Sequence, residues 1–577
     1  MLLSASLALA QSTDWTNYGL TPEETRYSPL AQINDKNAGQ LKLAWSYDIG
    51  KGGGTQEATP LVWNKTLFSI TNWSIVYALD AATGKEKWRW DPEVNQDTVR
   101  SKVCCGVANR GMVVYQGLII APIIDGRLVA LDAETGKPKW EARVSWPQDN
   151  YTVTMAPRIA KNKVIIGVAG AEFPTRGYFD AYDAKTGERS WRFYTVPGDP
   201  SKPFENPALK EAAKTWAGDF WKLQGGGSVW DGMAYDPEAD LLYVGTGNGG
   251  PWPEELRKSK GLANLYLCSV VAVKPDTGEL KWYFQMVPGD SWDFDSVQQL
   301  LLADLTIKGQ KRKVLMQANK NGFFYVLDRL SGQFISGKPF AKVTWAAGLD
   351  EKSGKPFVNK EAYYGDQLIE ISPSTGGAHN WPPMSFNPST GLVYIPGAIG
   401  SSSTFAIDRD FVYKPGENNR GIRRGAPTTP GGPGANLPAV LPPPPAIGPE
   451  IGPDTPRNVL VAWDPVNQVE RWRRTGGGAV GGGTLTTAGN LVFQVIPDGH
   501  LVAYTADKGE KVLDIDTGLR GGMGPPMTFQ LDGKQYISLA GGTGVVVGPA
   551  YPPNTPLPAP TANTVFPKLL TYVLEAR

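Results

Sequence analysis

The amino-acid sequence predicts an all-β protein folded as a β-propeller of eight blades, each with four strands. The main observation is a repeat, ALDAATGKEKW at residues 78–88, which returns as ALDAETGKPKW at residues 130–140. Strand-like apolar segments precede the copies, as MVVYQGLII does at residues 112–120. The chain also holds 67 glycines and 48 prolines, enough for many turns. Seven detectable copies suit seven or eight blades, and their regular recurrence disfavours an array of β-sandwiches.

Each copy of the repeat has the features of a β-hairpin. An apolar run ends at an aspartate such as Asp80, a Thr-Gly pair at Gly84 turns the chain, and a second strand leads to Trp88. The aspartate can accept hydrogen bonds from the turn, and glycine adopts positive φ without steric penalty. Because one hairpin cannot bury its own face, we expect the tryptophan to pack one blade against the next. Further copies end at Trp191 and Trp282 or span residues 326–335, 462–472 and 503–513.

We expect a single propeller domain over residues 11–577. Residues 1–10 are interpreted as the remnant of a secretory signal, because Ala8-Leu9-Ala10 fits a small-x-small cleavage pattern. An apolar N-terminal strand is the alternative. No other apolar run approaches the roughly 20 residues that span a bilayer. We therefore expect no membrane span and a soluble protein exported to the periplasm.

Two segments interrupt the repeat. Residues 206–218 have a helical composition. Residues 413–458 are rich in proline and glycine, and we expect a loop insertion that wraps the surface, lines an active-site rim or lacks order. After Tyr551 the chain is again proline-rich and is expected to close over the outside of the structure.

Charge and composition exclude several functions. Lysine and arginine total 57 and aspartate and glutamate 56, so the net charge of +1 leaves no electrostatic footprint for nucleic acid. The two histidines, His379 and His500, cannot build a histidine-rich zinc site. The sequence contains no Cys-x-x-Cys-His string, so we expect no covalent c-type haem in this chain.

Two of the three cysteines, Cys104 and Cys105, are adjacent in sequence. Neighbouring thiols can close into an eight-membered disulfide ring, which requires a distorted peptide bond because adjacent Cα atoms lie closer than in ordinary disulfides. Such strain is found mostly at functional sites. An oxidising compartment permits the bond. We therefore expect a disulfide here, with two reduced neighbouring thiols as the alternative.

Several segments together resemble the quinoprotein alcohol dehydrogenases. They are KVCCGVANRG, GVAGAEFPTRGYFDAYDAKTG, GGGSVWDGMAYDP, GTGNGGPW, PGDSWDFD, KNGFFYVLDR and GGAHNWPPMSFNPSTGLVYIP, which occur in the family's order over roughly residues 14–548. The family consists of eight-bladed propellers that use pyrroloquinoline quinone and a metal ion. The detail around Lys320 and His379-Asn380-Trp381 is most similar to the quinohaemoprotein branch, which has a C-terminal cytochrome domain. We expect no such domain in this chain.

The resemblance implies a metal site made of Glu172, Asn248, Asp293 and Asp295. Their oxygen atoms suit a hard cation such as calcium. Asp293 and Asp295 are two residues apart, so in an extended segment both side chains would face the same side. The lanthanide-dependent members share this Asp-x-Asp pattern, and a second carboxylate suits a trivalent ion. We therefore expect one lanthanide ion, with calcium as the alternative; the other reading is that these aspartates cap a turn.

The resemblance also implies how pyrroloquinoline quinone is bound. Trp230 would stack under the ring, and the disulfide ring of Cys104 and Cys105 would cover it. Arg110 and Lys320 would offer positive charge to the quinone or its carboxylates. The positions that match further contacts are Glu57, Thr154, Gly170, Ala171, Ser228, Asn380 and Trp381.

By this resemblance, the protein oxidises primary, and in some cases secondary, alcohols to aldehydes or ketones by metal-assisted hydride transfer to the quinone. Asp293 would take the hydroxyl proton as catalytic base. A separate soluble periplasmic cytochrome c would accept the electrons, and a homodimer remains open. The alternatives are a non-catalytic propeller scaffold and a quinone-dependent dehydrogenase for polymeric alcohols or polyethers.

Overall fold

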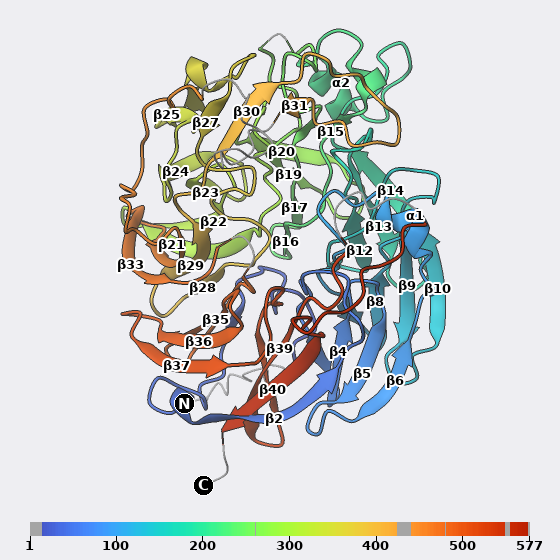
Figure 1. Cartoon of the computed structure of the whole chain (residues 1–577), viewed down its shortest axis with the longest axis vertical. Helices are drawn as coiled ribbons and strands as arrows, with labels where there is room; N and C mark the ends of the chain where they lie inside the picture. The colour runs from blue at the N-terminus through green and yellow to red at the C-terminus, as the bar shows by residue number, and fades with distance from the viewer. Residues whose placement is uncertain (1–13, 260, 424–439, 479–480, 548–553, 575–577) are drawn as a thin grey trace, which may run out of the picture.

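The computed structural model describes residues 14–259, 261–423, 440–478, 481–547 and 554–574. The interpretation of residues 1–10 as a signal remnant lies outside these residues. Most of the regular secondary structure in the described residues is β-strand. Eight sheets of four or five strands are present, and they are arranged around one centre (Figure 1). The predicted all-β class is confirmed, and the assignment of these sheets to eight blades stays a prediction.

The three sheets from the N-terminal part of the chain each use four consecutive antiparallel strands. The strands are β3 (Leu61–Trp63), β4 (Thr66–Ile70), β5 (Val76–Asp80) and β6 (Glu86–Trp90); β7 (Val113–Tyr115), β8 (Leu118–Pro122), β9 (Arg127–Asp132) and β10 (Pro138–Arg143); and β11 (Arg158–Ala160), β12 (Lys163–Gly167), β13 (Tyr178–Asp183) and β14 (Arg189–Tyr194).

The next three sheets are also antiparallel, but two of them are interrupted by excursions between their second and third strands. The strands are β16 (Met233–Asp236), β17 (Leu241–Gly245), β19 (Ser269–Val273) and β20 (Leu280–Gln285); β21 (Leu301–Ile307), β22 (Gln310–Ala318), β23 (Phe323–Asp328) and β24 (Phe334–Pro339); and β28 (Ser385–Asn387), β29 (Leu392–Ala398), β32 (Asn458–Asp464) and β33 (Val469–Thr475).

The last two sheets combine strands from both ends of the chain. Strand β1 (Tyr27–Ser28) runs parallel to β34 (Thr484–Thr487), which continues into the other three strands of its sheet. Strand β2 (Leu41–Asp48) pairs antiparallel with β40 (Lys568–Leu574), so an early strand closes the ring with a late one. The remaining strands are β35 (Leu491–Val495), β36 (His500–Thr505), β37 (Lys511–Asp516), β38 (Met527–Leu531) and β39 (Lys534–Gly541).

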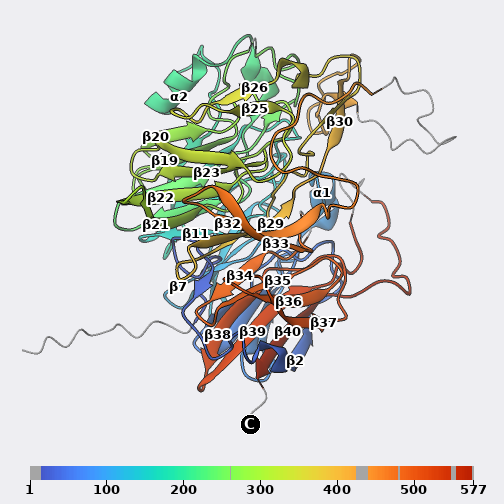
Figure 2. The same ribbon diagram turned by 90° about the vertical axis from the view of Figure 1, so that its left-hand side faces the viewer.

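Short helices and short strands lie outside the eight sheets. The expected helical segment contains α2 (Pro207–Ala213), which begins where the Asn206 side chain accepts the Leu209 N–H at 3.0 Å. Helix α1 (Gln96–Arg100) and strand β30 (Ser403–Ile407) lie on the same side of the sheets (Figure 2). None of the described helices is long and apolar enough to span a bilayer. The other short elements are α1 (Gln96–Arg100), η1 (Ala38–Gln40), η2 (Phe220–Leu223), η3 (Lys360–Ala362), β15 (Gly225–Gly226), β18 (Gly249–Gly250), β25 (Ala346–Leu349), β26 (Pro356–Val358), β27 (Ile369–Ile371), β30 (Ser403–Ile407) and β31 (Ile422–Arg423).

The tryptophan at the end of one hairpin packs on the turn of the next sheet. Trp88 Nε1 donates to Ala133 O at 3.1 Å, and Trp140 Nε1 donates to Ala184 O at 3.2 Å. Gly136 lies under the Trp88 ring with φ +69°, where a Cβ would come within 2.7 Å of the indole. The predicted packing between neighbouring sheets is therefore confirmed. The same hydrogen bond is made by Trp45, Trp191 and Trp472.

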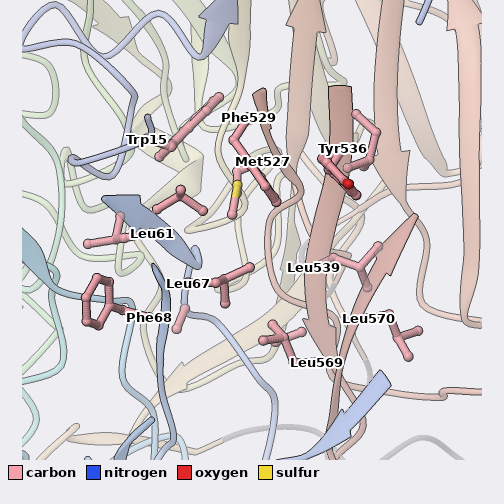
Figure 3. Close-up of a cluster of buried hydrophobic side chains, with 14 of the residues drawn as sticks. Trp15, Leu61, Leu67, Phe68, Met527, Phe529, Tyr536, Leu539, Leu569 and Leu570 are labelled. Atoms are coloured by element: carbon pink, nitrogen blue, oxygen red, sulfur yellow. The ribbon is translucent and has the colours of Figure 1, made fainter. Parts of the chain in front are cut away.

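The hydrophobic core continues across the junction where the ring closes. Leu67 of β4, Met527 of β38 and Leu569 of β40 belong to one buried cluster, together with Trp15 from the N-terminal segment (Figure 3). All four side chains are fully buried. Burial of this kind contributes about 25 cal/mol per Å² of apolar surface, so the first and last sheets are held together by packing as well as by strand pairing.

Candidate functional site

One cavity of about 430 Å³ gathers the residues singled out from the sequence. All of them except Ala171 line it; Ala171 is buried between two lining residues, Gly170 and Glu172. The lining residues that were predicted are Glu57, Cys104, Cys105, Arg110, Thr154, Gly170, Glu172, Ser228, Trp230, Asn248, Asp293, Asp295, Lys320, Asn380 and Trp381.

The topology explains why residues so distant in sequence meet. Each lies on a loop that either joins the last strand of one sheet to the first of the next or joins the second strand of a sheet to the third. Arg110 lies between β6 and β7, Asp293 between β20 and β21, and Lys320 between β22 and β23. In antiparallel sheets with four sequential strands, these two kinds of loop emerge on the same side. Because this strand order recurs from sheet to sheet, the loops that carry the site residues all lie on one face of the ring.

Lys320 stands between the two predicted aspartates. Its Nζ lies 2.8 Å from Asp295 Oδ2 and 3.1 Å from Asp293 Oδ2, and all three side chains are buried. The expectation of an extended segment at Asp293 is wrong, because its φ is +68°. Asp290 holds this turn by accepting the backbone N–H groups of Trp292 and Phe294 at 3.2 and 3.1 Å. The turn, and not strand alternation, brings both carboxylates to the lysine.

The electrostatics of this group favour a proton or a cation. Burial raises the pKa of Asp293 well above its ordinary value, and the carboxylates of Asp295 and Glu172 raise it further, against the opposing charge of Lys320. Burial lowers the pKa of Lys320, but Asp293 and Asp295 outweigh it and the net direction is upward. Three carboxylates that crowd one cavity leave a site suited to additional positive charge.

The predicted metal ligands are close, but they are not assembled around one point. Asp295 Oδ1 accepts the backbone N–H of Asn248 at 2.9 Å and the Trp230 Nε1–H at 3.4 Å. Within the described ranges, no set of three or more His, Cys, Asp or Glu side chains is grouped to hold a metal ion. The chemistry of Glu172, Asn248, Asp293 and Asp295, all oxygen donors on one cavity, fits a hard cation, and their role as ligands stays a prediction.

Arg110 links several of the predicted cofactor contacts. Its guanidinium lies 2.7 Å from Glu57 Oε2, donates to Thr154 Oγ1 at 2.9 Å and donates to the Trp230 carbonyl at 3.2 Å. The same group lies 4.8 Å from the centroid of the Trp230 ring. Ser228 Oγ is buried and has no hydrogen-bond partner in the structure. An aromatic face, two cations and an unpaired hydroxyl fit a flat anionic quinone.

The predicted disulfide is wrong for this structure. Cys104 and Cys105 are both free thiols, half-buried and exposed respectively. A hydrogen bond from the neighbouring Cys105, together with burial, raises the pKa of Cys104 well above its ordinary value. Reduced neighbouring thiols avoid the distorted peptide bond that the eight-membered ring would impose. The position of the pair on the cavity wall agrees with the sequence prediction.

Among the lining residues that the sequence analysis did not name are Trp252 and Arg420. Arg420 lies in the insertion predicted at residues 413–458, of which residues 424–439 lie outside the described part. The guanidinium of Arg420 lies 5.2 Å from the centroid of the Trp252 ring. Part of the insertion thus forms a rim of the cavity. An arginine in a proline- and glycine-rich segment carries no periodic signal, so no local pattern singled out this residue.

Comparisons with known proteins identify the family of this chain. A family model described as "Glucose/ethanol/alcohol dehydrogenase, beta-propeller domain", under the label PQQ, matches residues 15–344. "Quinohemoprotein alcohol dehydrogenase ADH IIB" of Pseudomonas putida is 48% identical, covering 92% of this chain and 74% of the relative. "1-butanol dehydrogenase (cytochrome c)" of Thauera butanivorans is 41% identical, covering 95% and 77%.

A solved structure agrees as well. The structure described as "Europium-containing methanol dehydrogenase" superposes with a TM-score of 0.83 at 32% identity, covering 97% of this chain and 98% of that one. With the family match over residues 15–344, it confirms the propeller fold expected from the repeat. The chain belongs to the PQQ family of glucose, ethanol and alcohol dehydrogenases.

Proposed function

We propose that this protein oxidises small alcohols to aldehydes or ketones with pyrroloquinoline quinone and one bound metal ion, and that electrons pass to a soluble cytochrome c in the periplasm. The observation that carries the proposal is the pairing of Asp293 and Asp295 with Lys320 in the cavity that also holds Arg110 and Trp230. The names of the relatives, an alcohol dehydrogenase and a cytochrome c-linked butanol dehydrogenase, support the substrate and acceptor.

Asp293 is suited to accept the hydroxyl proton of the alcohol. Its carboxylate is buried, and its raised pKa makes it a stronger base than an exposed aspartate. Lys320 holds this carboxylate in place through a 3.1 Å contact. Both side chains are buried, which keeps this interaction strong. The chain thus supplies the base and its orientation.

The cofactors supply the remaining chemistry: when bound, the quinone is a two-electron acceptor and the metal ion is a Lewis acid. Arg110 and Lys320 would hold the quinone by charge, and Trp230 would stack on it. Further contacts are proposed for Glu57, Cys104, Cys105, Thr154, Gly170, Ala171, Ser228, Asn380 and Trp381. The ion would be held by oxygen atoms of Glu172, Asn248, Asp293 and Asp295.

For the metal, we favour a lanthanide over calcium. Asp295 adds a third carboxylate to those of Glu172 and Asp293, and more negative ligands favour a trivalent ion. The europium-containing structural relative supports this choice. The alternative of a non-catalytic scaffold is disfavoured, because a scaffold has no use for buried carboxylates and cations that line one cavity.

The test is reconstitution of purified apo-protein. We expect dye-linked oxidation of ethanol only after addition of pyrroloquinoline quinone together with a metal ion, and higher activity with lanthanum than with calcium. The Asp293→Asn variant, loaded in the same way, serves as the inactive control. Absence of activity with both ions, in protein that binds the quinone, would refute the proposed reaction.

A further inference from the structure

Backbone hydrogen bonds hold the part of the insertion around Arg420 against the cavity. Asn419 donates its backbone N–H to the Glu172 carbonyl at 2.7 Å, and Trp252 donates its backbone N–H to the Arg420 carbonyl at 2.9 Å. The guanidinium of Arg420 packs over the Trp252 ring at 5.2 Å. Trp252 is itself buried, so it is a rigid platform. These contacts fix the guanidinium at the cavity wall.

Among the described residues, no acceptor is paired with this guanidinium. Its Nε is buried without a hydrogen-bond partner, and no carboxylate of the described residues forms an ion pair with Arg420. Arg110, on the same cavity, is by contrast paired with Glu57 at 2.7 Å. Arg420 is half-buried, and a buried N–H without a partner is costly, because its lost hydration is not replaced. Such a group is positioned for an anionic ligand.

The negative charges nearest to Arg420 show which part of the cavity it faces. Glu172 and Asp293 line the same cavity as Arg420, and the residue before Arg420 is bonded to the Glu172 carbonyl; their charges raise the pKa of Arg420 on balance, although burial lowers it. Asp293 is the proposed base, so the guanidinium faces the place where the alcohol would react. Arg110 lies instead against the Trp230 ring, at the proposed quinone position. The two arginines therefore serve different ligands.

We propose that Arg420 binds the carboxylate of a substrate that carries both an alcohol and a carboxylate group, which makes hydroxy acids a preferred substrate class. The inference rests on the proposed function, because the alcohol end must face Asp293. In this reaction Asp293 would accept the hydroxyl proton, and the quinone, when bound, would be the acceptor of the carbinol hydrogen and its two electrons, so the product would be an aldehyde acid. The carboxylate is unchanged and is held by the planar guanidinium, which can bind both of its oxygens.

The first test compares ω-hydroxy acids from 3-hydroxypropanoate to 6-hydroxyhexanoate with their methyl esters, in the reconstituted enzyme. For at least one chain length, we expect kcat/KM of the acid to exceed that of the ester. Arg420→Met should lower this ratio by about 10- to 100-fold, the usual value of a charged hydrogen bond. Lys414→Met removes a charge from the same segment outside the cavity and should leave the ratio unchanged. An acid-to-ester ratio that never exceeds one in the wild type would overturn the proposal.

The second test measures binding without turnover. 3-Hydroxy-3-methylbutanoate is a tertiary alcohol, so it has no carbinol hydrogen to lose. By calorimetry with the quinone-loaded enzyme, Arg420→Met should weaken its binding at least tenfold. Fluorescence titration of the quinone should give equal affinities for both proteins. If the variant weakens quinone binding and leaves the hydroxy acid unaffected, Arg420 serves the cofactor and the proposal is overturned.

Failure of this inference can be told apart from failure of the proposed function. A wild-type enzyme that oxidises ethanol but shows no preference for any acid over its ester would keep the alcohol dehydrogenase reaction and refute the role of Arg420. A protein inactive on ethanol and on every hydroxy acid would refute both.

Discussion

Lys320 contacts Asp295 at 2.8 Å, closer than its 3.1 Å contact with Asp293, so one ammonium group serves both carboxylates. In the absence of another cation, this ammonium balances part of the charge that the two aspartates bring into a buried site. An added metal ion must share these carboxylates with Lys320. The lysine is therefore placed to orient the aspartates and to tune how strongly they hold a cation.

Replacing the proposed base should remove catalysis while the cavity stays intact. Asp293→Asn keeps the shape of the side chain but cannot accept the hydroxyl proton, so kcat should fall by roughly 10²- to 10⁴-fold. Steady-state dye reduction measures the rate, and fluorescence titration measures quinone affinity, which should change little. A variant that retains half of the wild-type kcat would show that another group takes the proton.

The second carboxylate should decide which metal works. Asp295→Ala removes one negative charge and one oxygen ligand, so lanthanum-supported turnover should be lost while any calcium-supported turnover is affected less. The check is the ratio of the two activities in protein loaded with the quinone and each ion in turn. Equal lanthanum-supported activity in wild type and variant would contradict our preference for a lanthanide.

The contact between a hairpin glycine and the preceding tryptophan should be a stability determinant. At Gly136, with φ +69°, an added methyl group would meet the Trp88 ring at 2.7 Å. Gly309 has a similar φ of +77° but open space around it, so it is a matched control. Gly309→Ala should cost about 1 kcal/mol of unfolding free energy, and Gly136→Ala a further 1–3 kcal/mol or so from overpacking. Denaturant unfolding measures both, and equal costs would contradict a role for the tryptophan.

Glu24 should give the protein a pH-dependent stability. Burial raises its pKa from 4.5 to about 7, against the opposing charge of Arg158 at 2.7 Å. The folded state therefore binds this proton more tightly than the unfolded state. The contribution of this proton to the free energy of unfolding is fully present below pH 4.5. It is lost as the pH rises through 7, and the total loss is about 3 kcal/mol.

The Glu24→Gln variant isolates this effect. An amide cannot ionise, so the variant lacks the pH-dependent contribution of Glu24. Between pH 4.5 and 7 its free energy of unfolding should therefore fall by about 3 kcal/mol less than that of the wild type. The pKa of His379 is lowered by burial to about 4, which gives a slope of opposite sign over part of this range in both proteins. The difference between the two proteins cancels it. Parallel curves would mean that Glu24 is not the responsible group.

Much of the fold and the site follows from short sequence signals. The hairpin repeat predicted the tryptophan packing seen at Trp88, because turn geometry and a large apolar ring are local properties. Motifs around Arg110 and Asp293 placed these residues in one site through family resemblance. The left-handed φ of Asp293 escaped prediction, because it depends on hydrogen bonds to Asp290 in the folded turn. Arg420 escaped too, because only the path of the folded insertion brings it to the cavity.

The pairing of β2 with β40 has a consequence for biosynthesis. Leu41 pairs with Leu574, so more than 500 further residues must be synthesised before these two strands can pair and close the ring. Contacts between such distant segments slow folding. During that delay the free edge of β2 is open to pairing with other chains. The edge of β2 therefore needs to be protected from other chains until synthesis is complete.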